Sequence, residues 1–217
     1  MLVEKLKTEN SSRGEKNDFL VLSIPRGGVV VGKIISKELG YDFGLIISRK
    51  LTAPSNRELA CGAIIDKDNF VLNDEIINSL NISEREIEME MEIQLNEIET
   101  RRKKYNTVEK KYQDKVIFLV DDGVATGYTV LISLKKIKQE KPKEMILCTP
   151  VISDTRYDFL KEYCDKIFYL IKESDFLFGS VGQFYDDFKQ IEDEEIERIL
   201  REWTNKIIWS YIIKTIN

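Results

Sequence analysis

The chain has 217 residues, of which 42% are hydrophobic and 33% are charged, a composition typical of a globular protein with a substantial core. Its formal net charge of −5 argues against a general nucleic-acid binder, and the absence of histidine excludes Ser-His-Asp and Cys-His catalysis and histidine metal sites. No apolar run approaches the roughly 20 residues that cross a bilayer, and the first ten residues lack the apolar part of a signal peptide, so we expect a cytoplasmic protein.

The first fifty residues alternate between strand-like and helix-like patterns. A nearly continuous apolar run at Phe19–Ile24 predicts a buried strand, and apolar residues at helical spacing then continue as far as Gly40, which predicts a helix. A second apolar run at Phe43–Ser48 predicts the next strand, which ends on Arg49 and Lys50. This β-α-β order favours a parallel sheet with both faces covered.

A hairpin and a long helix interrupt this alternation. The stretch Leu59–Asn73 predicts two short strands joined by a turn at Asp66–Asn69. Ser83 and Glu86 form a capping-box pattern, after which an apolar stripe runs along a charged helix to about Tyr105. The stripe covers too few heptads for a coiled coil, so we interpret the helix as an amphipathic helix that lies on the domain.

The alternation resumes in the second half of the chain. Apolar runs predict three further strands, at Val116–Val120, Met145–Ile152 and Lys166–Ile171. Helical patterns cover Thr129–Lys138 and Asp154–Tyr163, and an irregular, aromatic-rich segment precedes an acidic helix that begins at about Glu192.

These elements predict an α/β fold with a central, mostly parallel sheet flanked by helices on both faces. We expect a single domain over residues 1–217, with the hairpin-plus-helix insertion at 51–112 forming a flap or hood. The C-terminal segment 172–217 is expected to contribute to the same hood.

Unusual residues follow three of the predicted strands, at the sheet edge where open parallel sheets collect ligands. The turn Ala125–Thr129 leads directly into a helix, so its free amides, the helix dipole and two hydroxyls suit a phosphate group. Asp121 and Asp122 suit neutral hydroxyls or a magnesium ion, and a sugar phosphate satisfies both demands. The other two strand ends carry Pro25-Arg26-Gly27-Gly28 and Arg49-Lys50.

These motifs resemble those of a known family. The stretch "VIFLVDDGVATGYT" resembles the phosphoribosyl diphosphate (PRPP) signature of type I phosphoribosyltransferases, and "SIPRGGVVVG" resembles their pyrophosphate loop. Residues Arg49–Ile64 and Val181–Ile196 are similar to a subgroup that brings no assigned substrate. The resemblance covers about Phe19–Ile196 and implies the fold of that family.

The resemblance also implies a reaction, the transfer of the 5-phosphoribosyl group from PRPP to a nitrogen acceptor (a base or an amine) with release of pyrophosphate. Asp121 and Asp122 would bind the ribose hydroxyls and approach Mg²⁺ through water or the ribose. The residues of the turn would hold the 5-phosphate: Gly123, Ala125, Thr126, Gly127 and Thr129.

The remaining two motifs would face the leaving group. Arg26, Gly27 and Gly28 would bind the pyrophosphate, in a loop where the family often has a cis peptide bond that does not involve a proline nitrogen. Arg49 or Lys50 would be catalytic, as the cation that stabilises the departing pyrophosphate.

Two positions depart from the family pattern. Gly123 stands where many members have an aliphatic residue. Ala125 stands where members acting on 6-oxopurines carry an aspartate that handles the purine proton, so we expect a different acceptor and no side-chain base in this turn. The sequence does not name the acceptor.

Two alternative functions stay open. Some proteins of this fold bind PRPP or nucleotides as a regulatory signal without catalysis and act on nucleic acid, although the basic run Arg101–Tyr105 reads as the end of a helix that complements its dipole. The second alternative is a nucleoside triphosphatase, because Gly27–Lys33 fits the pattern G-x-x-x-x-G-K. However, Ile34 follows this pattern, where a Ser or Thr would bind Mg²⁺.

The family is often dimeric, and the apolar stripe Ile87–Ile98 could pack on a partner. We therefore expect a homodimer.

Overall fold

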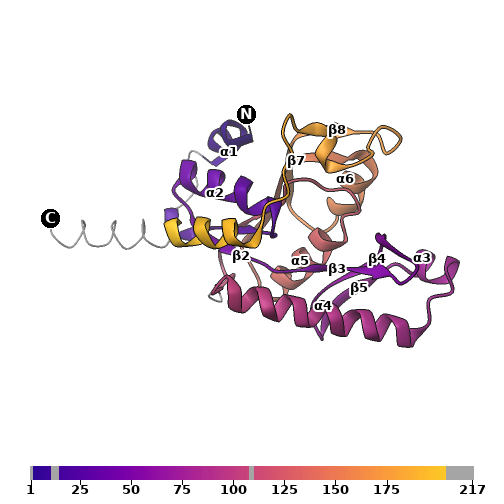
Figure 1. Cartoon of the computed structure of the whole chain (residues 1–217). Coiled ribbons are helices and arrows are strands. Elements are labelled where there is room, and N and C mark those ends of the chain that lie inside the picture. The colour runs from indigo at the N-terminus through magenta and orange to yellow at the C-terminus, as the bar shows by residue number, and fades with distance from the viewer. Residues whose placement is uncertain (1, 11–14, 108–109, 204–217) are drawn as a thin grey trace.

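The computed structural model describes residues 2–10, 15–107 and 110–203. Its centre is a five-stranded parallel sheet with the strand order β2-β1-β6-β7-β8 (Figure 1). The strands are β1 (Phe19–Ser23), β2 (Asp42–Leu45), β6 (Val116–Val120), β7 (Glu144–Ser153) and β8 (Lys166–Glu173). Every residue of β1 and β6 is buried, as their unbroken apolar runs predict for strands covered on both faces.

Helices cover both faces of this sheet, so the predicted α/β fold with a central parallel sheet is confirmed. Alternate residues of β1 enter two separate cores: Phe19 and Val21 pack with α1 (Leu2–Asn10) and α2 (Gly27–Leu39). Leu20 and Leu22 pack with α5 (Tyr128–Gln139) and α6 (Asp154–Leu160) on the other face. The sequence pattern did not predict α1, because only Leu2 and Leu6 of its nine residues are buried and so short a helix depends on tertiary packing.

A second, antiparallel sheet follows β2 and has the order β3-β4-β5. It consists of β3 (Arg49–Ala53), β4 (Asn56–Asp66) and β5 (Asn69–Leu72), and the helices α3 (Asp74–Ser79) and α4 (Glu84–Lys104) follow it. The predicted hairpin is present, and α4 runs along this sheet (Figure 1), with Ser83 as its N-cap in a capping box.

The start of the second sheet differs from the prediction. We expected Arg49 and Lys50 to end the second parallel strand, but β2 stops at Leu45 and these residues begin β3. The chain leaves the parallel sheet after Ile46, whose amide donates to Ser23 O at 3.0 Å. Lys50 then pairs with Ala63 of β4, a pairing between distant residues that the apolar pattern of the run could not indicate.

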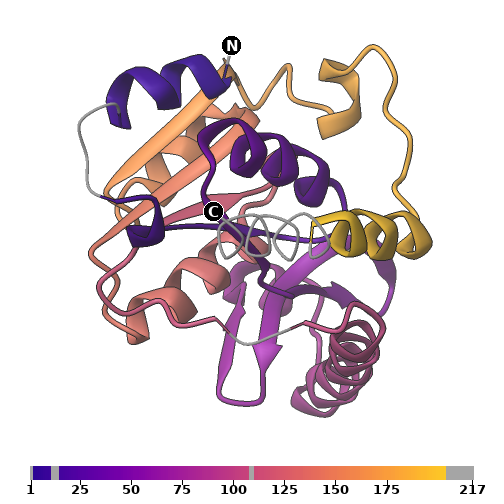
Figure 2. The same cartoon turned by 90° about the vertical axis from the view of Figure 1, so that its left-hand side faces the viewer.

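The segment after β8 crosses back over the molecule. It contains a short 3₁₀ helix η2 (Val181–Phe184) and a helix over residues 193–203, which lies beside α2 (Figure 2). Ile196 and Ile199 of this helix are buried against the same core as α2. The part of the predicted C-terminal hood from residue 204 to 217 lies outside the described residues.

None of the helices in the described part of the chain is both long enough and apolar enough to cross a membrane.

Candidate functional site

A cavity of about 750 Å³ opens at the carboxyl ends of β1 and β6. It brings together nearly all of the residues that the sequence indicated: Arg26, Gly27, Arg49, Lys50, Asp121, Asp122, Gly123, Ala125, Thr126, Gly127 and Thr129. Gly28 does not line it. A Cβ at that position would lie 2.8 Å from Val120 O, so Gly28 lets the start of α2 pack closely on β6.

Two helices begin at the cavity without a capping side chain. The N-caps of α2 and α5 are Arg26 and Gly127, and neither helix receives a side-chain hydrogen bond at its start. By contrast, α3, α4 and α6 are capped by the side chains of Asn73, Ser83 and Ser153. The amides and positive dipole ends of α2 and α5 are therefore available to an anion in the cavity.

Gly127 gives the turn before α5 its shape. Its φ of 77° lies in the left-handed region, which favours glycine, and it allows the chain to turn from Ala125 and Thr126 into the helix. The peptide bond between Pro25 and Arg26, at the start of α2, is cis, as the sequence resemblance implied.

The two carboxylates lie against the start of α2, in the turn that leads from β6 to α5. Asp121 is 9% exposed and accepts a hydrogen bond at Oδ1 from the Asp122 amide at 3.0 Å. Asp122 packs against Gly27, where an added Cβ would overlap its Oδ2, so that position requires glycine. The loop after β1 therefore packs directly on the acid pair, which begins the turn after β6.

Burial makes the acid pair hard to ionise. It raises the pKa of Asp121 well above its ordinary value, and the adjacent Asp122 raises the pKa further. Burial also raises the pKa of Asp122, although hydrogen bonds and the Lys50 ammonium oppose this shift. Such a pair gains from a cation or from hydroxyl donors.

The acid pair fits a magnesium ion whose other ligands come from water and from a substrate. No group of three potential metal-ligating side chains occurs in the described ranges, so the protein alone offers no full coordination shell. Mg²⁺ usually keeps waters and is held by one or two carboxylates together with substrate phosphates. Asp121 and Asp122 would be those carboxylates for an ion bound in the cavity.

Arg49 and Lys50 are not equivalent in the structure, although the sequence treated them as alternatives. Lys50 is exposed, and its positive charge partly opposes the upward shift of the pKa values of both aspartates. Arg49 is half-buried, and its Nε donates to Gln94 Oε1 of α4 at 2.9 Å. Neighbouring residues of a strand point to opposite sides, which separates the two cations.

A hydrogen-bond chain fixes the orientation of Gln94. Its Nε2 donates to Glu90 Oε1 at 3.0 Å, and the same oxygen accepts from the amide and the hydroxyl of Thr52 at 3.0 and 2.8 Å. Gln94 is 7% exposed, so α4 and β3 together hold the Arg49 guanidinium in place.

Sequence reasoning missed the contribution of α4 to the cavity. Gln94 and Arg101 both line it, whereas we had interpreted Arg101 only as part of the basic end of a helix. A spacing of seven residues places both on one helix face, and this was the signal available in the sequence.

The segment that follows β8 closes another side of the cavity. Val181, Phe188, Lys189, Gln190 and Ile191 contribute to its lining. The Tyr185 hydroxyl donates to Asp122 O at 2.6 Å. A Cβ on Gly123 would lie 2.3 Å from Val181 Cγ1, which accounts for glycine at this departure from the family pattern.

The G-x-x-x-x-G-K pattern has no support as a nucleotide loop. Residues 27–33 form the first turns of α2, and Lys33 makes an ion pair with Glu202 at 2.6 Å. Gly32 is buried, and a Cβ there would overlap Ser23 Oγ. The pattern therefore serves helix packing.

Comparisons with known proteins agree with this geometry. The crystal structure of the protein TT1426 from Thermus thermophilus superposes on this chain with a TM-score of 0.71, and the two sequences are 32% identical, with 93% of each chain covered. The proteins "Putative phosphoribosyl transferase MT0597" and "Putative phosphoribosyl transferase Rv0571c", from two strains of Mycobacterium tuberculosis, are each 29% identical over 183 residues. These residues make up 83% of this chain but 41% of those proteins, so the chain spans about two fifths of their length.

The family model of the phosphoribosyl transferase domain matches residues 2–186, which include β1, β6 and the whole antiparallel sheet. With most of the chain matched and the cavity at the expected edge of the sheet, the chain belongs to the phosphoribosyl transferase domain family.

Proposed function

We propose that this chain transfers the 5-phosphoribosyl group from PRPP to a nitrogen acceptor and releases pyrophosphate. The observation that carries this proposal is the composition of one cavity, which combines two uncapped helix starts, a largely buried acid pair and a set of cations. PRPP has the matching groups, with a phosphate, vicinal hydroxyls and a diphosphate along one small molecule.

Each part of the donor has a counterpart in the cavity. The turn Ala125–Thr129, at the start of α5, suits the 5-phosphate, because its amides point to the cavity without a capping side chain. Asp121 and Asp122 suit the ribose hydroxyls, which would donate to the carboxylates. Arg26, Gly27 and the start of α2 suit the diphosphate, and Gly28 acts through the close packing of that helix.

In the proposed reaction the bond between ribose C1 and the diphosphate oxygen breaks, and its electron pair leaves with the diphosphate. A bond from C1 to the acceptor nitrogen forms, and the proton that this nitrogen loses passes to solvent. Mg²⁺, held through Asp121 and Asp122 with oxygens of the substrate, would supply positive charge for the diphosphate. Arg49 or Lys50 would stabilise the charge that develops on the leaving group. The small Ala125 brings no base to this step.

Tyr185 does not act as a base in this proposal. Burial and the nearby Asp122 raise the pKa of its phenol, which stays protonated and donates to Asp122 O. Its role is to hold the segment after β8 against the acid pair.

We further propose that the chain forms a single domain in which residues 51–112 and the segment from 172 onward form a hood over the donor. The acceptor would enter between α4 and residues 181–191, where Gln94, Val181 and Phe188 line the cavity. A homodimer is our expectation for the assembly. Light scattering that gives the single-chain mass of 25.3 kDa at micromolar concentration would contradict it.

The proposal is tested by calorimetric titration with PRPP and Mg²⁺, followed by a screen of bases and amines for pyrophosphate release. We expect PRPP to bind and one acceptor class to release pyrophosphate. Binding of PRPP without release by any acceptor would favour a sensor of PRPP instead, and the absence of PRPP binding would contradict the proposal.

A further inference from the structure

Three arginines from three separate segments line the cavity. Arg26 comes from the loop after β1, Arg49 from β3 and Arg101 from the last turn of α4. Burial lowers the pKa of Arg49, and the positive charges of Arg101 and Arg26 lower it further, although the carboxylates of Glu97 and Glu90 oppose this shift.

Carboxylates only weakly compensate this cluster. Arg49 is hydrogen-bonded to the neutral Gln94, and Arg26 has a long contact of 3.5 Å with Glu192, whose side chain is 68% exposed. Within the described residues Arg101 makes no ion pair, so the i,i+4 pair with Glu97 that the sequence suggests is not formed there.

Among the other acids, the exposed Glu97 partly offsets the positive charge around Arg49, and two more already have partners. Glu90 accepts from Thr52 and Gln94. Asp193 accepts from the Tyr105 hydroxyl at 2.6 Å and lies 3.6 Å from Lys104 Nζ. Three clustered guanidinium groups, of which neither Arg49 nor Arg101 has an ion pair within the described residues, are costly unless an anion joins them.

We infer that Arg101 is a ligand-binding residue, which together with Arg26 and Arg49 binds the diphosphate of PRPP. This inference rests on the proposed function and deepens it. The arginine cluster, the acid pair and the turn at the start of α5 line one cavity, so a diphosphate and a phosphate of a single ligand have separate groups to bind. Planar guanidinium groups suit phosphate oxygens because they can donate two parallel hydrogen bonds.

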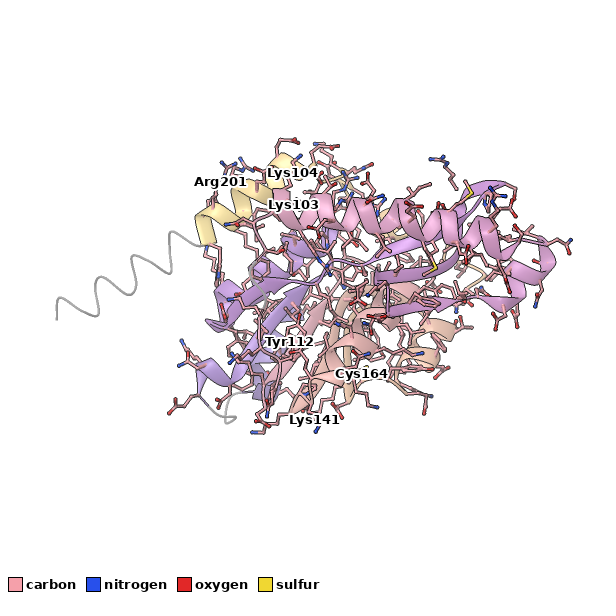
Figure 3. All side chains as sticks on the ribbon, turned by 90° about the horizontal axis from the view of Figure 1, so that it is seen from below. Lys103, Lys104, Tyr112, Lys141, Cys164 and Arg201 are labelled. Carbon is pink, nitrogen blue, oxygen red and sulfur yellow. The ribbon has the colours of Figure 1, made fainter. Side chains whose placement is uncertain are left out.

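The C-terminal helix holds Arg101 in position. One turn beyond Arg101, Tyr105 donates to Asp193, and Lys104 pairs with Glu194 at 2.9 Å. Figure 3 shows Lys103 and Lys104 at the end of α4, next to the helix that carries Arg201. The insertion therefore contributes a cation to the donor site, and a ligand diphosphate would replace the exposed Glu192 carboxylate beside Arg26.

The test compares Arg101→Gln with Lys103→Gln in the full chain. Lys103 lies on the same turn, and its side chain is 76% exposed and pairs with Glu99, so the control removes the same charge outside the cavity. Inorganic pyrophosphate and ribose 5-phosphate, each with Mg²⁺, are titrated separately by calorimetry. These two probes report on the two ends of the donor site.

We expect Arg101→Gln to weaken pyrophosphate binding by about 10- to 100-fold, the loss typical of a charged hydrogen bond, with unchanged ribose 5-phosphate binding. Arg101→Lys should recover part of the loss, and Lys103→Gln should stay within about twofold of the wild type.

Unchanged pyrophosphate affinity in Arg101→Gln would overturn the inference, while PRPP turnover by the wild type would still support the proposed function. An equal loss of both probes would also overturn it, because the change would then be a general disturbance of the site. If the wild type bound pyrophosphate through Arg101 but none of the screened acceptors gave PRPP turnover, the result would support the inference and contradict the proposed transferase activity.

Discussion

The two halves of the cavity are built in different ways. The core half comes from two contiguous stretches that follow adjacent parallel strands, and main-chain hydrogen bonds position it. The Ile24 amide donates to Val120 O, the Asp121 amide to Cys148 O and the Val124 amide to Val151 O, at 2.9 to 3.2 Å. The hood half comes from β3, α4 and residues 181–191, which are far apart in the sequence.

Side chains join the hood half. Arg49 donates to Gln94, and Tyr105 donates to Asp193, each across more than forty residues of sequence. A hydrogen bond between side chains disappears with one substitution, whereas main-chain bonds of the sheet tolerate most changes of residue. We therefore expect the core half to fix the donor and the hood half to tune the leaving group and the acceptor.

The largest effect is expected in the core half, from the double substitution Asp121→Asn and Asp122→Asn. In the proposed site it removes two charged acceptors of the ribose hydroxyls, so PRPP affinity with Mg²⁺ should fall by at least about 100-fold. Calorimetric titration measures it, and an unchanged circular dichroism melting curve verifies the fold.

The matched control is Asp74→Asn with Glu75→Gln, an adjacent pair of exposed acids at the start of α3, outside the cavity lining. This control should bind PRPP like the wild type. Equal PRPP affinity in the Asp121 and Asp122 double variant would refute the role given to the core half.

In the hood half, Arg49→Ala should lower turnover by roughly 10²–10³-fold, by analogy with the loss of one oxyanion donor. PRPP affinity should fall less, because the cation acts most strongly once charge has developed on the leaving group. The measurement is the rate of pyrophosphate release with the acceptor found in the screen.

Lys50→Ala is the companion variant for Arg49→Ala, because Lys50 interacts with the acid pair and lies outside the arginine cluster. Lys50→Ala should reduce turnover less than Arg49→Ala does. Near-normal turnover in both variants would show that the leaving-group cation lies elsewhere, and a larger effect at Lys50 would reverse the distinction.

The same division explains what the sequence could predict. The core half was readable because each motif is contiguous and its place at the carboxyl end of a buried strand follows from the apolar run before it. Arg49 and Lys50 were assigned to the wrong strand, since the pairing of Lys50 with Ala63 is a long-range contact. The role of α4 was also missed, because helical spacing gives a face but not the partner of that face.

Gly123 lies where the two halves meet, and Gly123→Ala should destabilise the protein. The added Cβ would meet Val181 of the hood and Val151 of the core at less than 3.0 Å. Such overpacking costs about 1–3 kcal/mol in the free energy of unfolding, which urea denaturation measures. Adding Val181→Ala should recover part of this loss, because the two residues share one space.

A matched control for this change is Gly179→Ala, where the added Cβ meets only the flexible Gln183 side chain at 3.0 Å. This variant should change the free energy of unfolding by no more than about 0.5 kcal/mol. If Gly123→Ala were as stable as the wild type, or if Val181→Ala brought no recovery, the hood segment would not be packed on the acid-pair turn as described.

The smallest effect concerns the joint between the hood sheet and the core helix α5. Asp66 of β4 pairs with Lys136 of α5 at 3.1 Å and accepts from Asn69 Nδ2 at 2.6 Å. Burial opposes the ionisation of Asp66, but the hydrogen bonds from Asn69 and Lys136 outweigh it and lower its pKa below the ordinary value. The ionised carboxylate therefore favours the folded state.

Because this pKa is depressed in the folded state, its contribution is complete above the pKa of the unfolded chain, about 3.9, and is lost as the pH falls through the folded value. Asp66→Asn should thus lower the free energy of unfolding by about 0.5–1 kcal/mol at pH 7 and progressively less below about pH 4. Asp68→Asn, an exposed neighbour in the same turn, should change nothing at either pH. If the loss of unfolding free energy in Asp66→Asn stayed the same in acid, the contact between β4 and α5 would depend on packing and not on this ion pair.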